Sequence, residues 1–199
     1  MPAPLGARRD NGDMTRLGVY PGSFNPPTLA HEAIIEAAMA THRLDRLDLA
    51  VSRVALAKEH VIRPRLEHRV QVLEAWLADR PCVGLVVTDA QLLVDIAAGY
   101  DVLVVGADKY QQLHDPSFYG SEPARDAALA RLPTVAVVPR PPHRVPAHLR
   151  LAVDGRHAGT SSSAARAGAR QLMVDAAAAF DRRTGAWTDP DRYERWLGA

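Results

Sequence analysis

The chain has 199 residues, of which 47% are hydrophobic, enough for one folded domain with a buried core. Lysine and arginine number 24 against 23 aspartates and glutamates, so the net charge is only +1 and gives no support for a nucleic-acid partner. The one cysteine, Cys82, excludes an intrachain disulfide framework and favours a reducing cytoplasm. No apolar run reaches the length of a membrane span, so we expect no membrane association.

Short apolar runs alternate with helical patterns along most of the chain. Residues 1–15 lack an apolar signal core, and we expect a disordered leader there, with Met14 as an alternative start. Period-two and continuous apolar runs predict strands at 16–20, 47–52, 83–88, 101–108 and 134–140, and a short sixth strand at 149–155. Helical spacing predicts helices at 29–42, 63–80, 89–99, 121–132, 161–180 and 189–197.

Two of these helices carry more detailed predictions. Thr28 stands where it can cap the helix at 29–42. In the helix at 63–80, Pro64 suits the first turn, and one apolar face is expected. The side chains of that face are Leu66, Val70, Leu73 and Leu77.

Strands that alternate with helices predict an α/β fold with a parallel sheet. We expect a Rossmann-like, doubly wound sheet of about five strands with helices on both faces and a C-terminal helical segment. Residues 16–199 are taken as one domain, because too little chain follows the Pro-rich loop at 139–148 to form a second core. Ligands bind outside the carboxyl ends of such strands, which selects the segments 21–31, 52–63 and 106–110.

The first of these segments has the composition of an anion site. Gly22 and Ser23 let the backbone pass close to a ligand, and the free N–H groups of a helix start attract phosphate. Thr28 and His31, three residues apart, share one face of that first turn and can direct donors at the same anion. On the residues alone, the alternative is that Thr28 only caps the helix and His31 is an ordinary surface histidine.

Residues 21–31, "PGSFNPPTLAH", resemble the first signature of the nucleotidyltransferase superfamily, G-x-F-[DN]-P-x-[HT]-x-G-H. Ala30 replaces the usual glycine, and Asn25 stands where many members have aspartate. Residues 159–168, "GTSSSAARAG", resemble the I-S-S-T-x-[IV]-R pattern of the same superfamily. The residues on its Ser, Thr and Arg positions are Ser162, Ser163 and Arg166.

Two further stretches resemble the nicotinate and nicotinamide mononucleotide adenylyltransferases. "VLVVGADKY" at 102–110 is similar to their G-[AS]-D motif, and "AVVPRP" at 136–141 to their V-V-x-R-x-G stretch. Each pattern alone is also what a capped helix or a strand-end turn produces. Because the three main patterns come in the right order and at predicted element ends, the chain is identified as similar to this family over about residues 17–170.

The resemblance implies that the adenylyl group of ATP passes to a small phosphorylated acceptor, with release of pyrophosphate. Nicotinate or nicotinamide mononucleotide is the implied acceptor, and Mg²⁺ comes with ATP, held by phosphate oxygens and water. The implied catalytic residues are Thr28, His31, Lys58 and Arg166. The implied nucleotide-binding residues are Gly22, Ser23, Phe24, Gly106, Asp108, Ser162 and Ser163, and the acceptor-binding residues are Arg69, Tyr119 and Arg140.

Several alternatives stay open. Bacterial members of that branch carry S-Y-T-x-x-T-L before the fourth strand, whereas "VTDAQLLVDIAAGYD" at 87–101 looks more like the "GLLVDYA" stretch of phosphopantetheine adenylyltransferases. A phosphopantetheine-type acceptor, another acceptor or CTP in place of ATP therefore remain alternatives. A non-catalytic nucleotide-binding protein is the alternative of another class, with Ala30 and Ser163 as signs of drift. An aminoacyl-tRNA synthetase relative is disfavoured, because no K-M-S-K-S-like loop is present.

The final stretch leaves the state of assembly open. "DRYERWL" at 191–197 packs either on the core or on a second subunit. Related enzymes are often oligomers, so the resemblance implies a homo-oligomer.

Overall fold

A computed structural model describes residues 15–53, 63–157 and 159–199. Its sheet has five parallel strands in the order β3-β2-β1-β4-β5. The strands are β1 (Leu17–Pro21), β2 (Arg46–Ser52), β3 (Val83–Thr88), β4 (Val102–Gly106) and β5 (Thr134–Val138). Because the first strand is central and the chain winds outward to both edges, the expected Rossmann-like class is confirmed.

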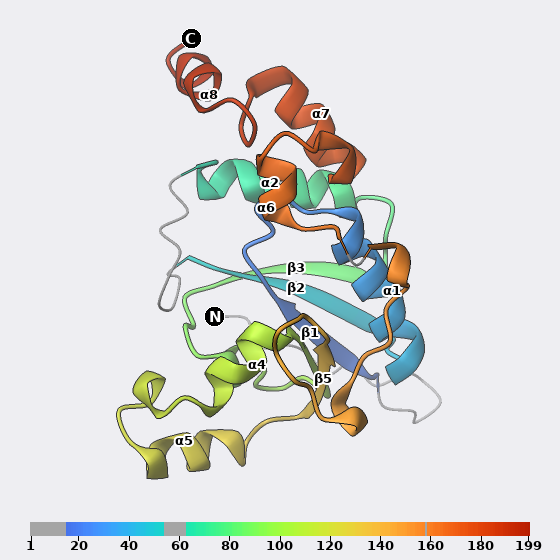
Figure 1. Ribbon diagram of the computed structural model, residues 1–199, viewed down its shortest axis with the longest axis vertical. Coiled ribbons are helices and arrows are strands. Elements are labelled where there is room, and N and C mark those ends of the chain that lie inside the picture. Colours follow the sequence, from blue (N-terminus) through green and yellow to red (C-terminus); the bar gives the residue numbers. More distant parts are fainter. Residues whose placement is uncertain (1–14, 54–62, 158) are drawn as a thin grey trace.

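Helices cover both faces of the sheet (Figure 1). One face packs against α1 (Leu29–His42), α2 (Leu66–Leu77) and α7 (Asp175–Thr184), and the other against α3 (Leu93–Ile96), α4 (Ala107–His114) and α5 (Glu122–Leu129). Neighbouring strand residues alternate between the two cores: Val104 faces the first, whereas Leu103 and Val105 face the second. Within the described ranges, every helix falls short of the length and apolar character that a membrane crossing requires.

The C-terminal segment packs on the first core. It contains α6 (Ser162–Arg166), α7 and α8 (Pro190–Leu197), and α7 lies against α2. Tyr193 of α8 is fully buried, and its ring stacks on Trp196 and meets His68 of α2 edge-on. The stretch 191–197 therefore covers the core of its own chain. Four 3₁₀ turns complete the described structure: η1 (Pro116–Phe118), η2 (Ala147–Leu149), η3 (Gly155–His157) and η4 (Arg170–Leu172).

Two predicted elements are shorter than expected. The helix at 89–99 is only α3, because side-chain hydrogen bonds hold the preceding residues extended: the Ala90 amide donates to Thr88 Oγ1, and Ser52 Oγ donates to the Ala90 carbonyl. The strand at 101–108 ends at Gly106, which serves as the N-cap of α4. Residues 107–110 therefore begin α4, a helix that the sequence patterns did not predict.

Other predictions need smaller corrections. The sixth strand at 149–155 is a single parallel bridge between Val137 and Arg150. The helix at 161–180 is two helices, interrupted at Gly168, whose φ of 114° favours glycine. Pro64 precedes α2, whose N-cap is Arg65. The buried face of α2 is rotated from the predicted one and excludes Val70; it consists of Arg69, Val72, Leu73, Trp76 and Leu77.

Candidate functional site

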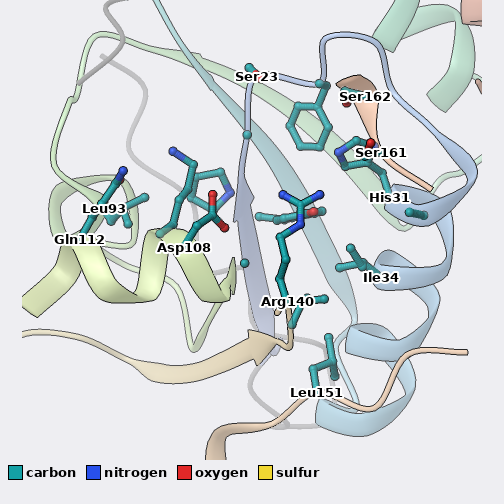
Figure 2. A pocket seen from close by; sticks show the side chains of 18 of the residues that line it. Ser23, His31, Ile34, Leu93, Asp108, Gln112, Arg140, Leu151, Ser161 and Ser162 are labelled. Carbon is teal, nitrogen blue, oxygen red and sulfur yellow. The ribbon is translucent and has the colours of Figure 1, made fainter. Parts of the chain in front are cut away.

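A cleft of about 1530 Å³ opens along the carboxyl ends of the strands. Its walls come from the ends of β1, β2, β4 and β5, the starts of α1 and α4, and the segment that leads into α6 (Figure 2). The cleft brings together all predicted site residues that the structure describes. They are Gly22, Ser23, Phe24, Thr28, His31, Arg69, Gly106, Asp108, Tyr119, Arg140, Ser162, Ser163 and Arg166. Lys58 lies outside the described residues.

His31 is fixed by the cap of its own helix. Thr28 is the N-cap of α1, and its backbone amide donates to His31 Nδ1 at 2.9 Å. Because Nδ1 is an acceptor there, the neutral ring carries its proton on Nε2. Burial, and secondly the charge of Arg140, lowers the pKa of His31 to about 4. His31 therefore meets a ligand as a neutral imidazole that donates through Nε2.

Thr28 supports this ring. Its side chain is fully buried, and its hydroxyl lies 2.9 Å from His31 Nδ1. The geometry thus gives Thr28 an orienting contact with His31 rather than an exposed hydroxyl in the cleft. Thr28 therefore caps the helix, as the alternative had it, and the same contact orients His31 in the cleft.

Phe24 supports His31 from the other side. Its backbone has a φ of 44°, and its side chain is 1% exposed. The ring lies edge-on to Tyr20 and His31, with centroid distances of 5.4 and 5.1 Å. A Cβ at Gly22 would lie 3.0 Å from the Phe24 ring, so glycine makes room for this packing. The first loop therefore presents its backbone to the cleft while Phe24 braces the histidine.

The second signature docks onto the first loop. Ser162 Oγ donates to the Pro26 carbonyl at 2.8 Å, and the Arg166 guanidinium donates to the Asn25 carbonyl. Arg166 also donates to Ser163 Oγ at 3.2 Å. Residues more than 130 positions apart in sequence thus form one wall of the cleft.

Asp108 and Arg140 face each other across the floor of the cleft. Asp108 lies in the first turn of α4, and its Oδ1 sits 2.6 Å from where a Cβ on Gly106 would be. Arg140 points into the cleft between Asp108 and His31 (Figure 2). Burial raises the pKa of nearby Tyr20, while Arg140 and Asp108 act on it in opposite directions. Tyr20 was missed because it reads as the last apolar residue of a strand.

Arg69 and Tyr119 both line the cleft. Arg69, on α2, is buried and donates from Nη1 to the Ser23 carbonyl at 2.9 Å, so it braces the first loop. Arg69 is therefore not a plain surface charge. Tyr119 is half-buried beside Phe118, and burial, then Asp95, raises the pKa of its hydroxyl. The rings of Phe118 and Tyr119 form an aromatic border of the cleft.

Cationic side chains predominate in the cleft. Arginine and lysine contribute six lining residues, Arg53, Arg69, Lys109, Arg140, Arg150 and Arg166, against the carboxylates of Asp108 and Asp154. Among the described residues, no group of three or more His, Cys, Asp or Glu side chains is placed to hold a metal ion. A cleft with this charge suits a polyanionic ligand.

The C-terminal segment also reaches the first loop, at residues outside every sequence motif. The Val174 amide donates to the Pro27 carbonyl at 3.2 Å, and Trp187 Nε1 donates to Asn25 Oδ1 at 2.7 Å. The one available sequence signal was that a buried tryptophan needs a partner for its N–H. That signal does not identify the partner.

A doubly wound parallel sheet with a cation-rich cleft at its carboxyl edge defines an α/β domain of the nucleotide-binding class. A family model described as cytidylyltransferase-like matches residues 19–168. The chain belongs to this family.

Three curated relatives are similar to parts of the chain. A probable nicotinate-nucleotide adenylyltransferase of Albidiferax ferrireducens is 34% identical over 89 residues, which cover 45% of this chain and 43% of the relative. A probable nicotinate-nucleotide adenylyltransferase of Sulfurimonas denitrificans is 27% identical over 160 residues, which cover 74% of this chain and 83% of the relative. A phosphopantetheine adenylyltransferase of Desulforamulus reducens is 38% identical over 81 residues, covering 38% and 47%. The match thus spans less than half the length of the first relative.

Solved structures share the fold. The nicotinic acid mononucleotide adenylyltransferase of Plasmodium falciparum, complexed with NaAD, has a TM-score of 0.64 at 11% identity, over 87% of this chain and 97% of that chain. The same enzyme complexed with APC has a TM-score of 0.60. At this identity the likeness supports the architecture.

Proposed function

We propose that this protein is a nucleotidyltransferase, which moves the adenylyl group of ATP onto the phosphate of a small acceptor. One observation carries the proposal: the two signature segments, which carry His31 and Arg166, are joined into one wall of a cation-rich cleft. Membership of the cytidylyltransferase-like family supports the same reaction class.

In the proposed reaction, an oxygen of the acceptor phosphate attacks the α-phosphorus of ATP. The bond from that phosphorus to the bridging oxygen breaks, and pyrophosphate leaves. His31 Nε2–H donates to phosphate oxygens at the reacting centre, and Arg166, with Ser162 and Ser163 beside it, neutralises the departing pyrophosphate. Because Nδ1 already accepts from Thr28, His31 acts as a donor rather than as a base. Catalysis then consists of positioning and charge neutralisation.

The nucleoside would lie along the β1 and β4 ends. The backbone of Gly22, Ser23 and Phe24 lines one side of the cleft there, and Gly106 and Asp108 line the other. A carboxylate such as Asp108 can accept hydrogen bonds from ribose hydroxyls. These five residues are the proposed nucleoside contacts.

Mg²⁺ fits this site as a companion of the triphosphate. The charged residues of the lining are mostly cationic, and the described residues form no carboxylate cage, which suits an ion held by phosphate oxygens and water. When bound, Mg²⁺ would supply further neutralisation of phosphate charge.

Nicotinate or nicotinamide mononucleotide is the proposed acceptor, and two curated relatives are probable nicotinate-nucleotide adenylyltransferases. The aromatic border at Phe118 and Tyr119 offers rings on which a flat heterocycle can stack. Arg69 and Arg140 supply charge for an anionic acceptor. Phosphopantetheine is the second candidate, because Leu92 and Leu93 of the "LLVD" stretch line the cleft and one relative carries that function.

Pyrophosphate release in the presence of Mg²⁺ tests the proposal. ATP and CTP would each be paired with nicotinate mononucleotide, nicotinamide mononucleotide and phosphopantetheine. We expect release with ATP and one acceptor, and a loss of about 100-fold or more in kcat for His31→Ala, as for removal of one transition-state donor. Turnover within a few-fold of the original protein would refute the role of His31.

His31→Gln is the matched control. Glutamine at this helix position can accept from the Thr28 amide and so preserve the cap. We expect it to restore the thermal stability that alanine loses but only part of the activity. If ATP binds by calorimetry while no pair releases pyrophosphate, the protein is instead a non-catalytic nucleotide-binding protein for these acceptors.

A further inference from the structure

Asn25 connects the catalytic wall with the C-terminal segment. It is 7% exposed and lies in the first loop. Its side-chain oxygen accepts from Trp187 Nε1 at 2.7 Å, and its backbone carbonyl accepts from the Arg166 guanidinium. Asn25 therefore accepts from the Trp187 indole through its side chain and from Arg166 through its backbone.

Trp187 is itself held firmly. It is 5% exposed, and its backbone amide donates to Asp181 Oδ1 at 2.8 Å. Asp181 is fully buried and accepts from Arg170 Nε at 2.6 Å and from the Thr188 amide and hydroxyl at 3.0 and 2.7 Å. A buried carboxylate with its acceptor sites filled fixes the turn that carries the indole.

The position of the Arg166 side chain depends on its hydrogen bond to the Asn25 carbonyl. Its side chain is exposed in the cleft, and its other hydrogen bond in the described structure goes to Ser163 Oγ, at an exposed residue. A guanidinium has five N–H donors, so two contacts to the protein leave donors for an anion. The direction of those donors follows from where the Asn25 carbonyl points.

We propose that Trp187 is a positioning residue for Arg166, acting through Asn25. The inference rests on the proposed function, since it presumes an anion that Arg166 must meet in a set direction. Trp187 lies outside residues 19–168, the part matched by the family model. The C-terminal helices thus contribute to the site without touching the reacting groups.

A double-mutant cycle between Trp187→Phe and Arg166→Ala tests the proposal. Phenylalanine keeps an aromatic ring at this position but has no N–H group to donate to Asn25. We expect Trp187→Phe to lower kcat about tenfold, because a small misalignment of a positioned group slows the reaction, with the acceptor KM changed less than about twofold. In the Arg166→Ala background the same substitution should change kcat less than about twofold, because the group that it positions is gone.

Pyrophosphate binding by calorimetry repeats the cycle without turnover. We expect Trp187→Phe to weaken pyrophosphate binding when Arg166 is present and to have no further effect when it is absent. If the loss in the double variant equals the product of the two single-variant losses in both assays, the role of Trp187 is merely structural and the proposal is overturned. Absence of turnover, with coupling intact in binding, would remove the proposed reaction and keep the positioning role. Failure of the original protein to bind pyrophosphate would overturn the positioning role.

Two further variants complete the design. Asn25→Leu removes the same hydrogen bond from the other partner, and it replaces Trp187→Phe in the cycle if that variant does not fold. Trp196→Phe is the matched control, because Trp196 belongs to the same C-terminal segment but packs on His68, Phe180 and Tyr193. We expect it to leave kcat and pyrophosphate binding unchanged; an equal loss there would count against a specific role for Trp187.

Discussion

Burial first, and the charge of Arg140 second, keep His31 neutral in the fold, and a backbone amide sets which ring nitrogen carries the proton. A charged imidazole has a proton on both nitrogens, so it cannot accept from the Thr28 N–H. Burial is the larger cause and the nearby Arg140 charge the smaller, and together they lower the pKa from 6.5 to about 4 in the folded chain. The unfolded chain therefore binds a proton at His31 at a higher pH than the folded chain does.

The direction of the pH effect follows from this difference. Stability contributed by neutral His31 is present above pH 6.5 and is lost as the pH falls from 6.5 toward 4. We expect the free energy of unfolding to fall with acidification by up to about 1.4 kcal/mol per pH unit more in the original protein than in His31→Gln. Denaturant titrations at several pH values measure it. Parallel curves for the two proteins would show that His31 titrates normally in the fold.

Single residues were predictable where their chemistry is local. Short patterns with a helix start and hydroxyl side chains already suggest a phosphate-binding site. They contain Gly22, Thr28, His31, Ser162 and Arg166, which line the cleft. Trp187 was missed because its partner lies far away in sequence: it meets Asn25 across 162 positions. No periodicity or spacing encodes that pairing, which exists only once α7 and α8 have packed.

At the scale of elements, the Tyr193 hydroxyl adds hydrogen bonds to the ring contacts between α8 and α2. Tyr193 OH accepts from the Arg65 amide at 3.0 Å, and it therefore donates its own proton to His68 Nδ1 at 2.6 Å. Burial lowers the pKa of His68, which suits a nitrogen that accepts. The last helix is thus connected to the N-terminus of α2, whose Arg69 braces the first loop of the cleft.

Removal of this hydroxyl tests the attachment. Tyr193→Phe leaves a part-buried amide and a part-buried ring nitrogen without their partner, so we expect a loss of about 0.5–1.5 kcal/mol in the free energy of unfolding. Urea titration measures the loss. Tyr110→Phe, whose ring packs edge-on to His114 at 4.8 Å, is the control and should change stability little. Equal stability of the two variants would refute the attachment.

Element types followed from periodicity, but some boundaries did not. The five strands and their order of alternation with helices were predictable because buried parallel strands are continuous apolar runs. The end of β4 was not, since "VVGAD" continues smoothly into α4 and only the backbone at Gly106 marks the change. The shortness of α3 depends on hydrogen bonds from β2 and β3, which a local pattern does not contain.

At the scale of the whole molecule, the cleft joins segments from both ends of the chain. Its walls include the β1 loop, the β4 and β5 ends and the start of α6, so a ligand that fills it touches both sides of the sheet. Such a ligand binds the folded chain and not the unfolded one. Its binding free energy is therefore added to the stability of the entire fold.

Thermal unfolding with Mg²⁺ and ATP tests this coupling. At 100 times its dissociation constant, ATP should stabilise the fold by about 2.7 kcal/mol. For a chain of this size, that corresponds to a rise in Tm of about 5–10 °C. Arg166→Ala should reduce the rise because a phosphate contact is lost, whereas Trp196→Phe should retain it, and chelation of Mg²⁺ should diminish it in every variant. A Tm that does not respond to ATP, in a protein that still unfolds cooperatively, would show that the cleft does not hold the triphosphate. The acceptor alone would then be the ligand to titrate, because its binding would raise Tm by the same mass action.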